Sequence, residues 1–248
     1  MTETLTNKKW TLGARPETSV SREHFKFETE IVRPLADGEF LVKNQYIAFE
    51  PAQRGWLNDV RSYLPPVAIG EVMRSGAAGE IIASKHSDYQ AGELVQGSFG
   101  WQEYAISDGT GLFPVTKIPA GIPMSYPLHI FGLTGLTAYF GLLDLGLPKA
   151  GETVLISGAA GATGSTVGQI AKLLGCRVIG IAGGQAKCQW LIDELGYDAV
   201  IDYKSDSVEQ QLQEVCKNSI DLFFDNVGGE ILDHALVNMA NNGRIVLC

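Results

Sequence analysis

The fold of this chain is decided by one stretch, Thr153-Val154-Leu155-Ile156-Ser157-Gly158-Ala159-Ala160-Gly161-Ala162-Thr163-Gly164-Ser165. An apolar run passes directly into a glycine-rich loop, and a helix-like segment follows at 167–174. Glycines let a backbone approach a phosphate closely, and the start of the following helix offers free N–H groups and the positive end of its dipole. The order of strand, glycine loop and helix therefore predicts a site for the pyrophosphate of a dinucleotide.

Downstream of this stretch, strand-like and helix-like segments alternate. Strands are expected at 154–157, 177–181, 199–203, 220–226 and 244–247, and helices at 164–174, 187–195, 208–217 and 230–241. The last helix is expected to place Ile231, Leu232, Ala235, Leu236 and Met239 on one apolar face and to stop at Gly243. Such alternation predicts an α/β fold with a doubly wound parallel sheet.

The first part of the chain has a different pattern. Short strands are expected at 25–31, 39–49, 79–84, 93–95 and 101–106, and turn residues separate them. This spacing predicts a compact β-barrel or folded sheet. Four prolines then interrupt the chain between 114 and 127, and a helix is expected at 133–143. The expected domains are therefore residues 1–125 and 126–248.

The composition limits the classes of partner. The chain has 45% hydrophobic and 19% charged residues and a formal net charge of −9. Nucleic acids and anionic membranes need a basic face, so this balance argues against both. No apolar stretch reaches the ~18 residues of a membrane helix, and the N-terminal residues lack the apolar core of a secretion signal. The four cysteines form no CxxC pair, which favours a reduced, cytoplasmic compartment.

The end of the second expected strand indicates which dinucleotide binds. NAD sites usually place an acid there, whereas this chain continues Ile181-Ala182-Gly183-Gly184-Gln185-Ala186-Lys187. The two glycines leave room for a 2′-phosphate, Lys187 can supply a positive charge, and Tyr203 can lie beside the phosphate or the adenine. A solvated surface lysine remains the alternative for Lys187, and a tight turn without a ligand remains the alternative for the glycine loop. The pattern favours NADP(H).

Residues suited to metal or nucleophilic catalysis are sparse in the sequence. A catalytic zinc takes about three Cys, His or carboxylate ligands, but the cysteines begin only at Cys176 and the four histidines form no HExxH motif. There is also no G-x-S-x-G motif. No metal site is therefore expected, and hydride transfer from a nicotinamide is the simplest chemistry. An alkene conjugated to a carbonyl suits such a site, because the enolate oxygen needs only hydrogen-bond donors.

Several motifs together resemble one known family. They are Glu50-Pro51-Ala52-Gln53-Arg54-Gly55-Trp56, Tyr63-Leu64-Pro65-Pro66, Gly132-Leu133-Thr134-Gly135-Leu136-Thr137-Ala138-Tyr139, the loop at 157–168, and Asp225-Asn226-Val227-Gly228-Gly229. In this order they are similar to the zinc-independent medium-chain dehydrogenase/reductases. Within that family they resemble the prostaglandin reductase, leukotriene B4 12-hydroxydehydrogenase and curcumin reductase group of NADPH-dependent alkenal double-bond reductases.

The resemblance implies a GroES-like first domain, a Rossmann second domain and an active site in the cleft between them. It implies that Gly161, Ala162, Thr163 and Gly164 contact the pyrophosphate and that Lys187 and Tyr203 hold the 2′-phosphate end. It places Asn226 near the nicotinamide ribose and implies that Cys248 also contacts the cofactor. Tyr63 would face the substrate and donate to the enolate oxygen, with packing beside the two prolines as its alternative role. The resemblance also implies that this chain can form a homodimer, because relatives often pair through the edge of the cofactor sheet.

Two departures from the family pattern bear on function. Many relatives carry a tyrosine where this chain has Ala52, which predicts a larger and less polar pocket. A dinucleotide-binding sheet usually has about six strands, and the sequence pattern contains fewer. The Rossmann sheet is therefore expected to be truncated at its C-terminus, with the strand at 244–247 as an open edge.

The resulting prediction is an NADPH-dependent reductase of the C=C bond of α,β-unsaturated aldehydes and ketones, with hydride delivered to the β-carbon. The chain by itself is expected to be weakly active or inactive. A quinone reductase of the same superfamily and a non-catalytic NADPH-binding protein are the alternatives.

Overall fold

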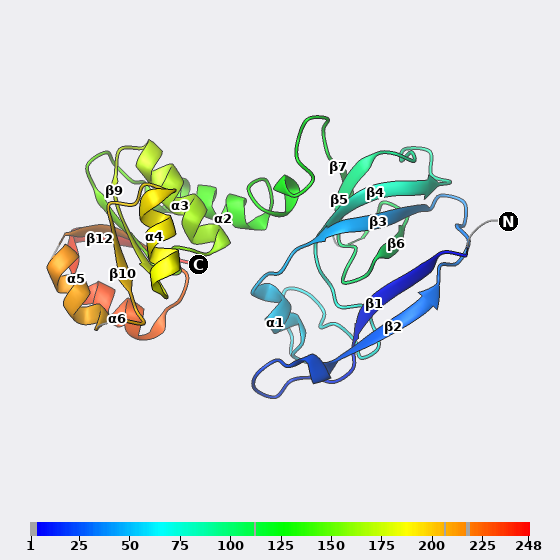
Figure 1. Cartoon of the computed structure of the whole chain (residues 1–248), viewed down its shortest axis with the longest axis horizontal. Helices are drawn as coiled ribbons and strands as arrows, with labels where there is room; N and C mark the ends of the chain where they lie inside the picture. The colour runs from blue at the N-terminus through cyan, green and yellow to red at the C-terminus, as the bar shows by residue number, and fades with distance from the viewer. Residues whose placement is uncertain (1–3, 112, 206, 217–218) are drawn as a thin grey trace. The chain divides into compact units, whose positions relative to one another are not determined.

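The computed structural model describes residues 4–111, 113–205, 207–216 and 219–248. The chain divides into two compact units, Met1–Leu128 and His129–Cys248, and each has its own buried core (Figure 1). Within the described residues, no helix combines the length and the apolar character that a membrane crossing needs.

In the second unit, the predicted doubly wound parallel sheet is confirmed. Its strands are β8 (Thr153–Ile156), β9 (Arg177–Ala182), β10 (Ala199–Asp202), β11 (Ile220–Asp225) and β12 (Met239–Leu247). They lie in the order β10-β9-β8-β11-β12, and every neighbouring pair is parallel. The strand order reverses between β8 and β11. The carboxyl ends of these two strands therefore form the switch point at which such sheets bind ligands.

Helices cover both faces of this sheet (Figure 1). One face carries α2 (Leu133–Phe140), the π-helical turn η3 (Gly141–Gly146), α3 (Ala162–Leu173) and α4 (Gln185–Asp193), and the other carries α5 (Val208–Cys216) and α6 (Gly229–Val237). Successive side chains of a strand point to opposite faces. Val154 and Ile156 accordingly lie in the core of the first face and Leu155 in that of the second, all three fully buried.

The last predicted helix ends earlier than the sequence suggested. The prediction of a helix at 230–241 is wrong at its end, because α6 stops at Val237 and Met239 begins β12. Asn238 ends the helix. Its Nδ2 donates to the carbonyl of His234 at 2.9 Å, and its own carbonyl accepts from the N–H of Ile220 at 3.3 Å. Met239 therefore pairs with Ile220 in the sheet, and Gly243 lies inside β12 instead of stopping a helix.

The first unit is built from antiparallel strands. One sheet has the order β6-β3-β4-β5-β7, and β1 and β2 form a separate ladder. The bounds are β1 (Thr6–Leu12), β2 (Phe25–Ile31), β3 (Phe40–Ile47), β4 (Ala77–Ser84), β5 (Leu94–Gly97), β6 (Tyr104–Ser107) and β7 (Thr116–Lys117). Short 3₁₀ turns lie at η1 (Arg22–His24) and η2 (Tyr126–Leu128).

Two apolar clusters hold the first unit together. Phe40, Val42 and Ile81 are fully buried in the main sheet core. The helix α1 (Ala52–Trp56) follows β3 and contributes Trp56 to a second cluster with Leu12 and other side chains. This second cluster fixes the segment that follows α1, which includes the predicted site residue Tyr63.

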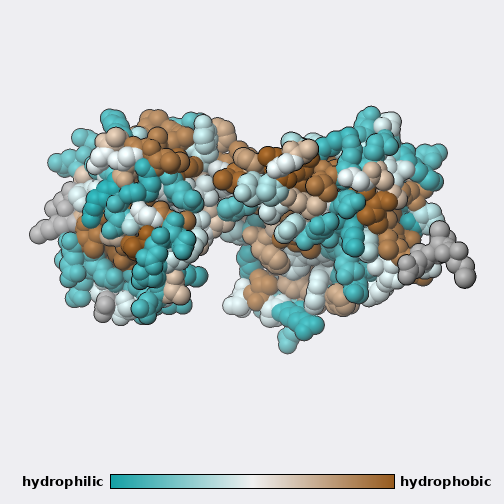
Figure 2. All heavy atoms as spheres, turned by 45° about the horizontal axis from the view of Figure 1, so that its top comes forward, coloured by the Kyte–Doolittle hydropathy of each residue, from teal (hydrophilic) through white to brown (hydrophobic). Residues whose placement is uncertain are grey.

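The surface mixes polar and apolar regions. On the face drawn in Figure 2, hydrophilic residues are spread over both units, and brown patches mark exposed apolar side chains. The exposed apolar side chains include Leu133, Leu136 and Phe140 of α2 and Leu145 in the turn after it.

Candidate functional site

The glycine loop joins β8 to α3 at the switch point of the parallel sheet. Gly158 has a left-handed backbone with φ of +57°, and Gly161 stands at the N-cap of α3 in an extended conformation. Ala162, Thr163 and Gly164 form the first turn of this helix of 12 residues. The first N–H groups of a helix have no partner inside the helix, so these residues lie where an anion is favourably bound.

Gly164 lies closest to the preceding loop. A Cβ atom on Gly164 would be 2.5 Å from the carbonyl oxygen of Gly158 and 2.8 Å from the Cα of Ala159. Both are backbone atoms, so a side chain here forces the loop to move. The glycine lets the helix start directly against the loop, as the last glycine of a dinucleotide-binding loop does.

Tyr197 packs against α3 and forms a hydrogen bond with Gly164, and it was not predicted as a site residue. Its ring is only 3% exposed, and its hydroxyl donates to the carbonyl of Gly164 at 2.9 Å. Burial raises the pKa of Tyr197, so the phenol is neutral near neutral pH. The one sequence feature that accompanies Tyr197 is the glycine at position 168. A Cβ on Gly168 would lie 2.0 Å from the Tyr197 hydroxyl, so the ring requires a glycine on that face of α3.

The predicted 2′-phosphate end forms a turn after β9. The Tyr203 ring lies against Gly183, where a Cβ would be 2.5 Å from the ring Cζ. The N–H of Lys187 donates to the carbonyl of Gly184 at 3.1 Å, which places Lys187, with an exposed side chain, in the first turn of α4. The structure therefore brings Gly183 together with Tyr203, and Gly184 with Lys187.

Asp202 holds this same turn and was also missed. Its carboxylate accepts from the N–H of Gly184 at 2.8 Å and from the N–H of Lys204 at 2.9 Å. These two hydrogen bonds lower the pKa of Asp202. An acid is thus present at the end of the third strand of the unit, but backbone amides already occupy its oxygen Oδ1.

The residues after β11 form a second loop beside the glycine loop. The Nδ2 of Asn226 donates to the carbonyl of Ser157 at 2.8 Å, and a Cβ on Gly158 would lie 3.5 Å from the Cβ of Asn226. The N–H of Cys248 donates to the carbonyl of Asp225 at 2.9 Å. The structure therefore places the predicted cofactor residues Asn226 and Cys248 at the same edge of the sheet as the glycine loop.

A buried carboxylate organises this second loop. Asp225 is buried, and its Oδ1 accepts from the hydroxyl of Ser157 at 2.7 Å and from the N–H groups of Val227 and Gly228, each at 3.0 Å. The Ser157 hydroxyl in turn accepts from the N–H of Asn226 at 2.8 Å. The pair of Ser157 and Asp225 thus joins the two loops. Both residues stand within motifs of the sequence, but neither motif predicts this role.

Tyr63 lies in the first unit, on the segment after α1. Its side chain is 73% exposed, and its hydroxyl oxygen accepts a hydrogen bond from the indole Nε1 of Trp56 at 3.1 Å. All the predicted cofactor residues belong to the second unit, so Tyr63 is the one predicted site residue of the first.

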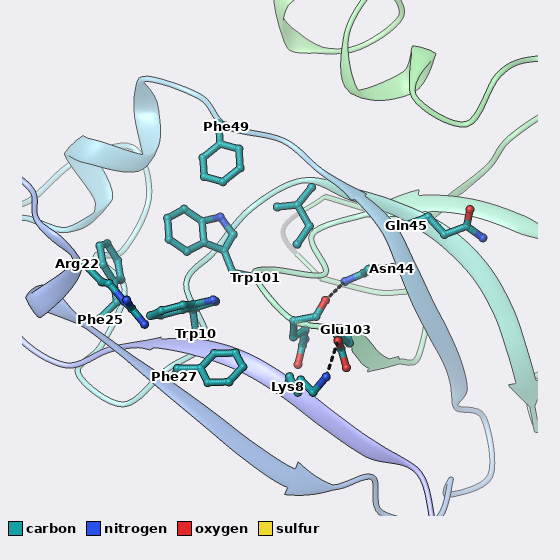
Figure 3. A pocket seen from close by; sticks show the side chains of 12 residues that line it. Lys8, Trp10, Arg22, Phe25, Phe27, Asn44, Gln45, Phe49, Trp101 and Glu103 are labelled. Carbon is teal, nitrogen blue, oxygen red and sulfur yellow. Dashed lines mark hydrogen bonds and ion pairs between the residues drawn. The ribbon is translucent and has the colours of Figure 1, made fainter.

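An aromatic pocket in the first unit was not predicted. It has a volume of about 600 Å³, and five of its lining side chains are the rings of Trp10, Phe25, Phe27, Phe49 and Trp101 (Figure 3). The charged residues at its wall are already engaged. Lys8 pairs with Glu103 at 3.5 Å, and the Arg22 guanidinium lies 5.4 Å from the centre of the Trp10 ring. No residue of the predicted site lines this pocket. Its rings come from segments far apart in the chain, which explains why no local motif revealed it.

Among the described residues, no three side chains of His, Cys, Asp or Glu are grouped so that they could hold a metal ion. The four cysteines are all free thiols, with Cys176 and Cys216 buried.

Two models of known protein families match the chain, one in each unit. A family model described as the N-terminal domain of oxidoreductase matches residues 8–115. A second model, described as zinc-binding dehydrogenase, matches residues 162–248.

Several individual proteins are similar to this chain over almost its whole length. The NADPH-dependent curcumin reductase of Escherichia coli (strain K12) is 41% identical over 242 residues, which cover 98% of this chain and 70% of that protein. Prostaglandin reductase 1 of Bos taurus is 39% identical over 243 residues, which cover 97% of this chain and 71% of that protein. The crystal structure of CurA in complex with NADPH from Vibrio vulnificus is 44% identical, with a TM-score of 0.87, and the match covers 96% of this chain and 70% of that one.

Proposed function

Because the chain belongs to the zinc-independent branch of the medium-chain dehydrogenase/reductase family, we propose that it reduces the C=C bond of α,β-unsaturated aldehydes and ketones with NADPH. The chain is an NADP-dependent oxidoreductase acting on CH–CH groups. The observation that carries the proposal is the glycine loop at the switch point, with Gly164 in close contact with Gly158. It supports a bound dinucleotide in a protein whose relatives are NADPH-dependent reductases.

The residues of the second unit fit NADPH along its length. The first turn of α3 offers N–H groups to the pyrophosphate. Lys187 offers its charge to the 2′-phosphate, and the nearby Asp202 is engaged through Oδ1 by the backbone amides of Gly184 and Lys204. Asn226 and Cys248, at the same edge of the sheet as the glycine loop, are the proposed contacts of the nicotinamide end. When bound, NADPH supplies the hydride that reduces the alkene.

The proposed role of the first unit is to stabilise charge on the substrate. Delivery of hydride to the β-carbon of an enone places negative charge on its carbonyl oxygen, and a positioned donor lowers the barrier to this step. Tyr63 is the proposed donor. Its hydroxyl is exposed, and the hydrogen bond from Trp56 occupies its oxygen as an acceptor and leaves its own hydrogen available.

The test is a comparison of cofactors and substrates. NADPH oxidation is followed at 340 nm with 3-nonen-2-one, and NADH is run beside it. We expect turnover with NADPH and little with NADH. Turnover with a quinone but with no enone or enal would favour the quinone reductase alternative. Clear NADPH binding without turnover of either class would favour a non-catalytic binding protein.

A further inference from the structure

Trp56 is held rigidly at the end of α1. Its side chain is 7% exposed and packs in an apolar cluster with Leu12, Leu57, Leu64, Val67 and Met73. The Arg74 guanidinium covers its ring at 5.5 Å from the ring centre. Burial and the covering guanidinium fix the indole plane, and with it the direction of its N–H group.

The segment that carries Tyr63 is attached to the same tryptophan and arginine. The carbonyl of Trp56 accepts from the N–H of Val67 at 2.9 Å, and Nη1 of Arg74 donates to the carbonyl of Pro65 at 2.9 Å. These two hydrogen bonds fix the turn Tyr63-Leu64-Pro65-Pro66 at Pro65 and at Val67, the residue that follows it. Its beginning is held through the Tyr63 hydroxyl, which receives the Trp56 indole N–H at 3.1 Å.

This hydrogen bond has only one direction. An indole nitrogen is a donor and never an acceptor, so the Tyr63 oxygen accepts and its own hydrogen points elsewhere. Hydrogen bonds in a chain polarise one another, so a hydroxyl that accepts from an N–H is also a stronger donor. Because the Tyr63 side chain is 73% exposed, packing by itself leaves the ring free to turn, and the contact with Trp56 sets its direction.

We propose that Trp56 is a positioning residue, which aims the Tyr63 hydroxyl as a hydrogen-bond donor toward the carbonyl oxygen of the substrate. This inference rests on the proposed function, in which Tyr63 faces the enone. A donor aligned in advance with the developing oxyanion contributes on the order of 10²–10³ to the rate. Loss of the alignment without loss of the tyrosine removes part of that factor.

The experiment is a double-mutant cycle. Trp56→Phe keeps an aromatic ring in the cluster and removes the indole N–H, together with part of the ring volume. We expect kcat with 3-nonen-2-one to fall about tenfold, and Tyr63→Phe to lower it about a hundredfold. The dissociation constant for NADPH should stay unchanged in both variants. Adding Trp56→Phe to Tyr63→Phe should have no further effect, because the indole then has no hydroxyl to orient.

Trp190→Phe is the matched control, since it makes the same chemical change on α4 in the second unit and should leave kcat unchanged. The proposal is overturned if Trp56→Phe keeps the wild-type kcat, or if its effect multiplies fully with that of Tyr63→Phe. Full multiplication would mean that Trp56 acts only through folding of the first unit.

A spectroscopic measurement separates this inference from the proposed function. The indole N–H resonance of Trp56 should shift in Tyr63→Phe because its acceptor is lost. If the wild type turns over no enone, the proposed function fails, and the catalytic role of Trp56 fails with it. If enones are turned over but the resonance does not move, the contact between Trp56 and Tyr63 and the positioning role of Trp56 are refuted, while the proposed function stands.

Discussion

Gly164 allows α3 to begin in close contact with the glycine loop. A Cβ at this position would lie 2.5 Å from the Gly158 oxygen and 2.8 Å from the Ala159 Cα. Overpacking of this kind costs about 1–3 kcal/mol, because backbone atoms have to move. We expect Gly164→Ala to lower the free energy of unfolding of the second unit by about 2 kcal/mol and to weaken NADPH binding more than tenfold. Urea unfolding and a fluorescence titration with NADPH measure the two effects.

Gly161→Ala provides the contrast for stability. Its Cβ would meet only the Gly158 oxygen, at 3.1 Å, and the backbone φ of −81° is ordinary for alanine. It should therefore destabilise the unit by less than about 1 kcal/mol. If the two variants lose the same stability, the close contact at Gly164 is not what constrains the loop.

Lys187 is predicted to distinguish the two nicotinamide dinucleotides. Its proposed partner is the 2′-phosphate, which NADH lacks. We expect Lys187→Met to raise the KM for NADPH about tenfold, which corresponds to about 1.4 kcal/mol, and to leave that for NADH unchanged. Lys204→Met is the control, since Lys204 follows Tyr203 in the chain. An equal effect of both substitutions would mean that the general positive charge of this region, and not Lys187, attracts the phosphate.

Single residues with a local motif could be predicted, whereas those defined by distant contacts could not. Gly161 and Lys187 lie at the starts of the helices that follow two apolar strands, so their place in the fold could be inferred. Tyr197 bonds to Gly164, and Ser157 bonds to Asp225 across 68 positions of sequence. Such pairs become neighbours only when the sheet forms, and no local spacing records them.

At the scale of elements, the packing of α3 against β9 depends on Tyr197. Its ring fills the space beside Gly168 of α3 and Gly180 of β9, and its hydroxyl bonds to Gly164. We expect Tyr197→Phe to lower the free energy of unfolding of the second unit by about 1 kcal/mol at pH 7, because the buried carbonyl of Gly164 loses its donor. Urea unfolding at a series of pH values measures this.

The pH dependence of the same variant has a definite sign. Burial raises the pKa of Tyr197 above its unfolded value of about 10, so the stability that the neutral phenol gives is present below that pH. It is lost as the pH rises, because the unfolded chain releases the proton first. The difference between wild type and Tyr197→Phe should therefore shrink above about pH 10. A constant difference from pH 7 to 11 would contradict the burial of the phenol.

Element type was easier to predict than element ends. Apolar runs bounded by turn residues identified β8 to β11 because buried parallel strands are continuously apolar. The strand β1 was missed, since its sequence Thr6-Asn7-Lys8-Lys9-Trp10-Thr11-Leu12 is polar and its buried positions are irregular. The predicted end of the last helix was wrong because the carbonyl of Asn238 accepts a hydrogen bond from β11. This tertiary contact overrides the helical pattern of 231–239.

At the scale of the whole molecule, the chain consists of two units with separate cores. The antiparallel unit is held by the cluster around Phe40 and the parallel unit by those around Leu155 and Phe224. All the predicted cofactor contacts lie in the parallel unit. The composition and the change of pattern near residue 125 could suggest two bodies. The aromatic pocket of the first unit could not be inferred, because its rings come from β1, β2 and the loops that follow β3 and β5.

This division predicts how NADPH changes thermal unfolding. A ligand that binds only the native state at 100 times its Kd stabilises that state by about 2.7 kcal/mol. If the cofactor contacts reside in the parallel unit, calorimetry should show two transitions, of which one rises by on the order of 10 °C with saturating NADPH. The other should stay within a degree of its original temperature. NADH at the same concentration should give a smaller rise.

Lys187→Met and Trp56→Phe assign the two transitions to their units. With Lys187→Met, the NADPH-dependent rise should shrink because the ligand then binds more weakly, while the second transition keeps its temperature. Trp56→Phe changes the apolar cluster of the first unit, so it should lower only the transition that NADPH does not move. If instead one transition is observed and both variants lower it equally, the units unfold together. The cores of Phe40 and Leu155 would then act as a single cooperative structure, and cofactor binding in one unit would stabilise the other as well.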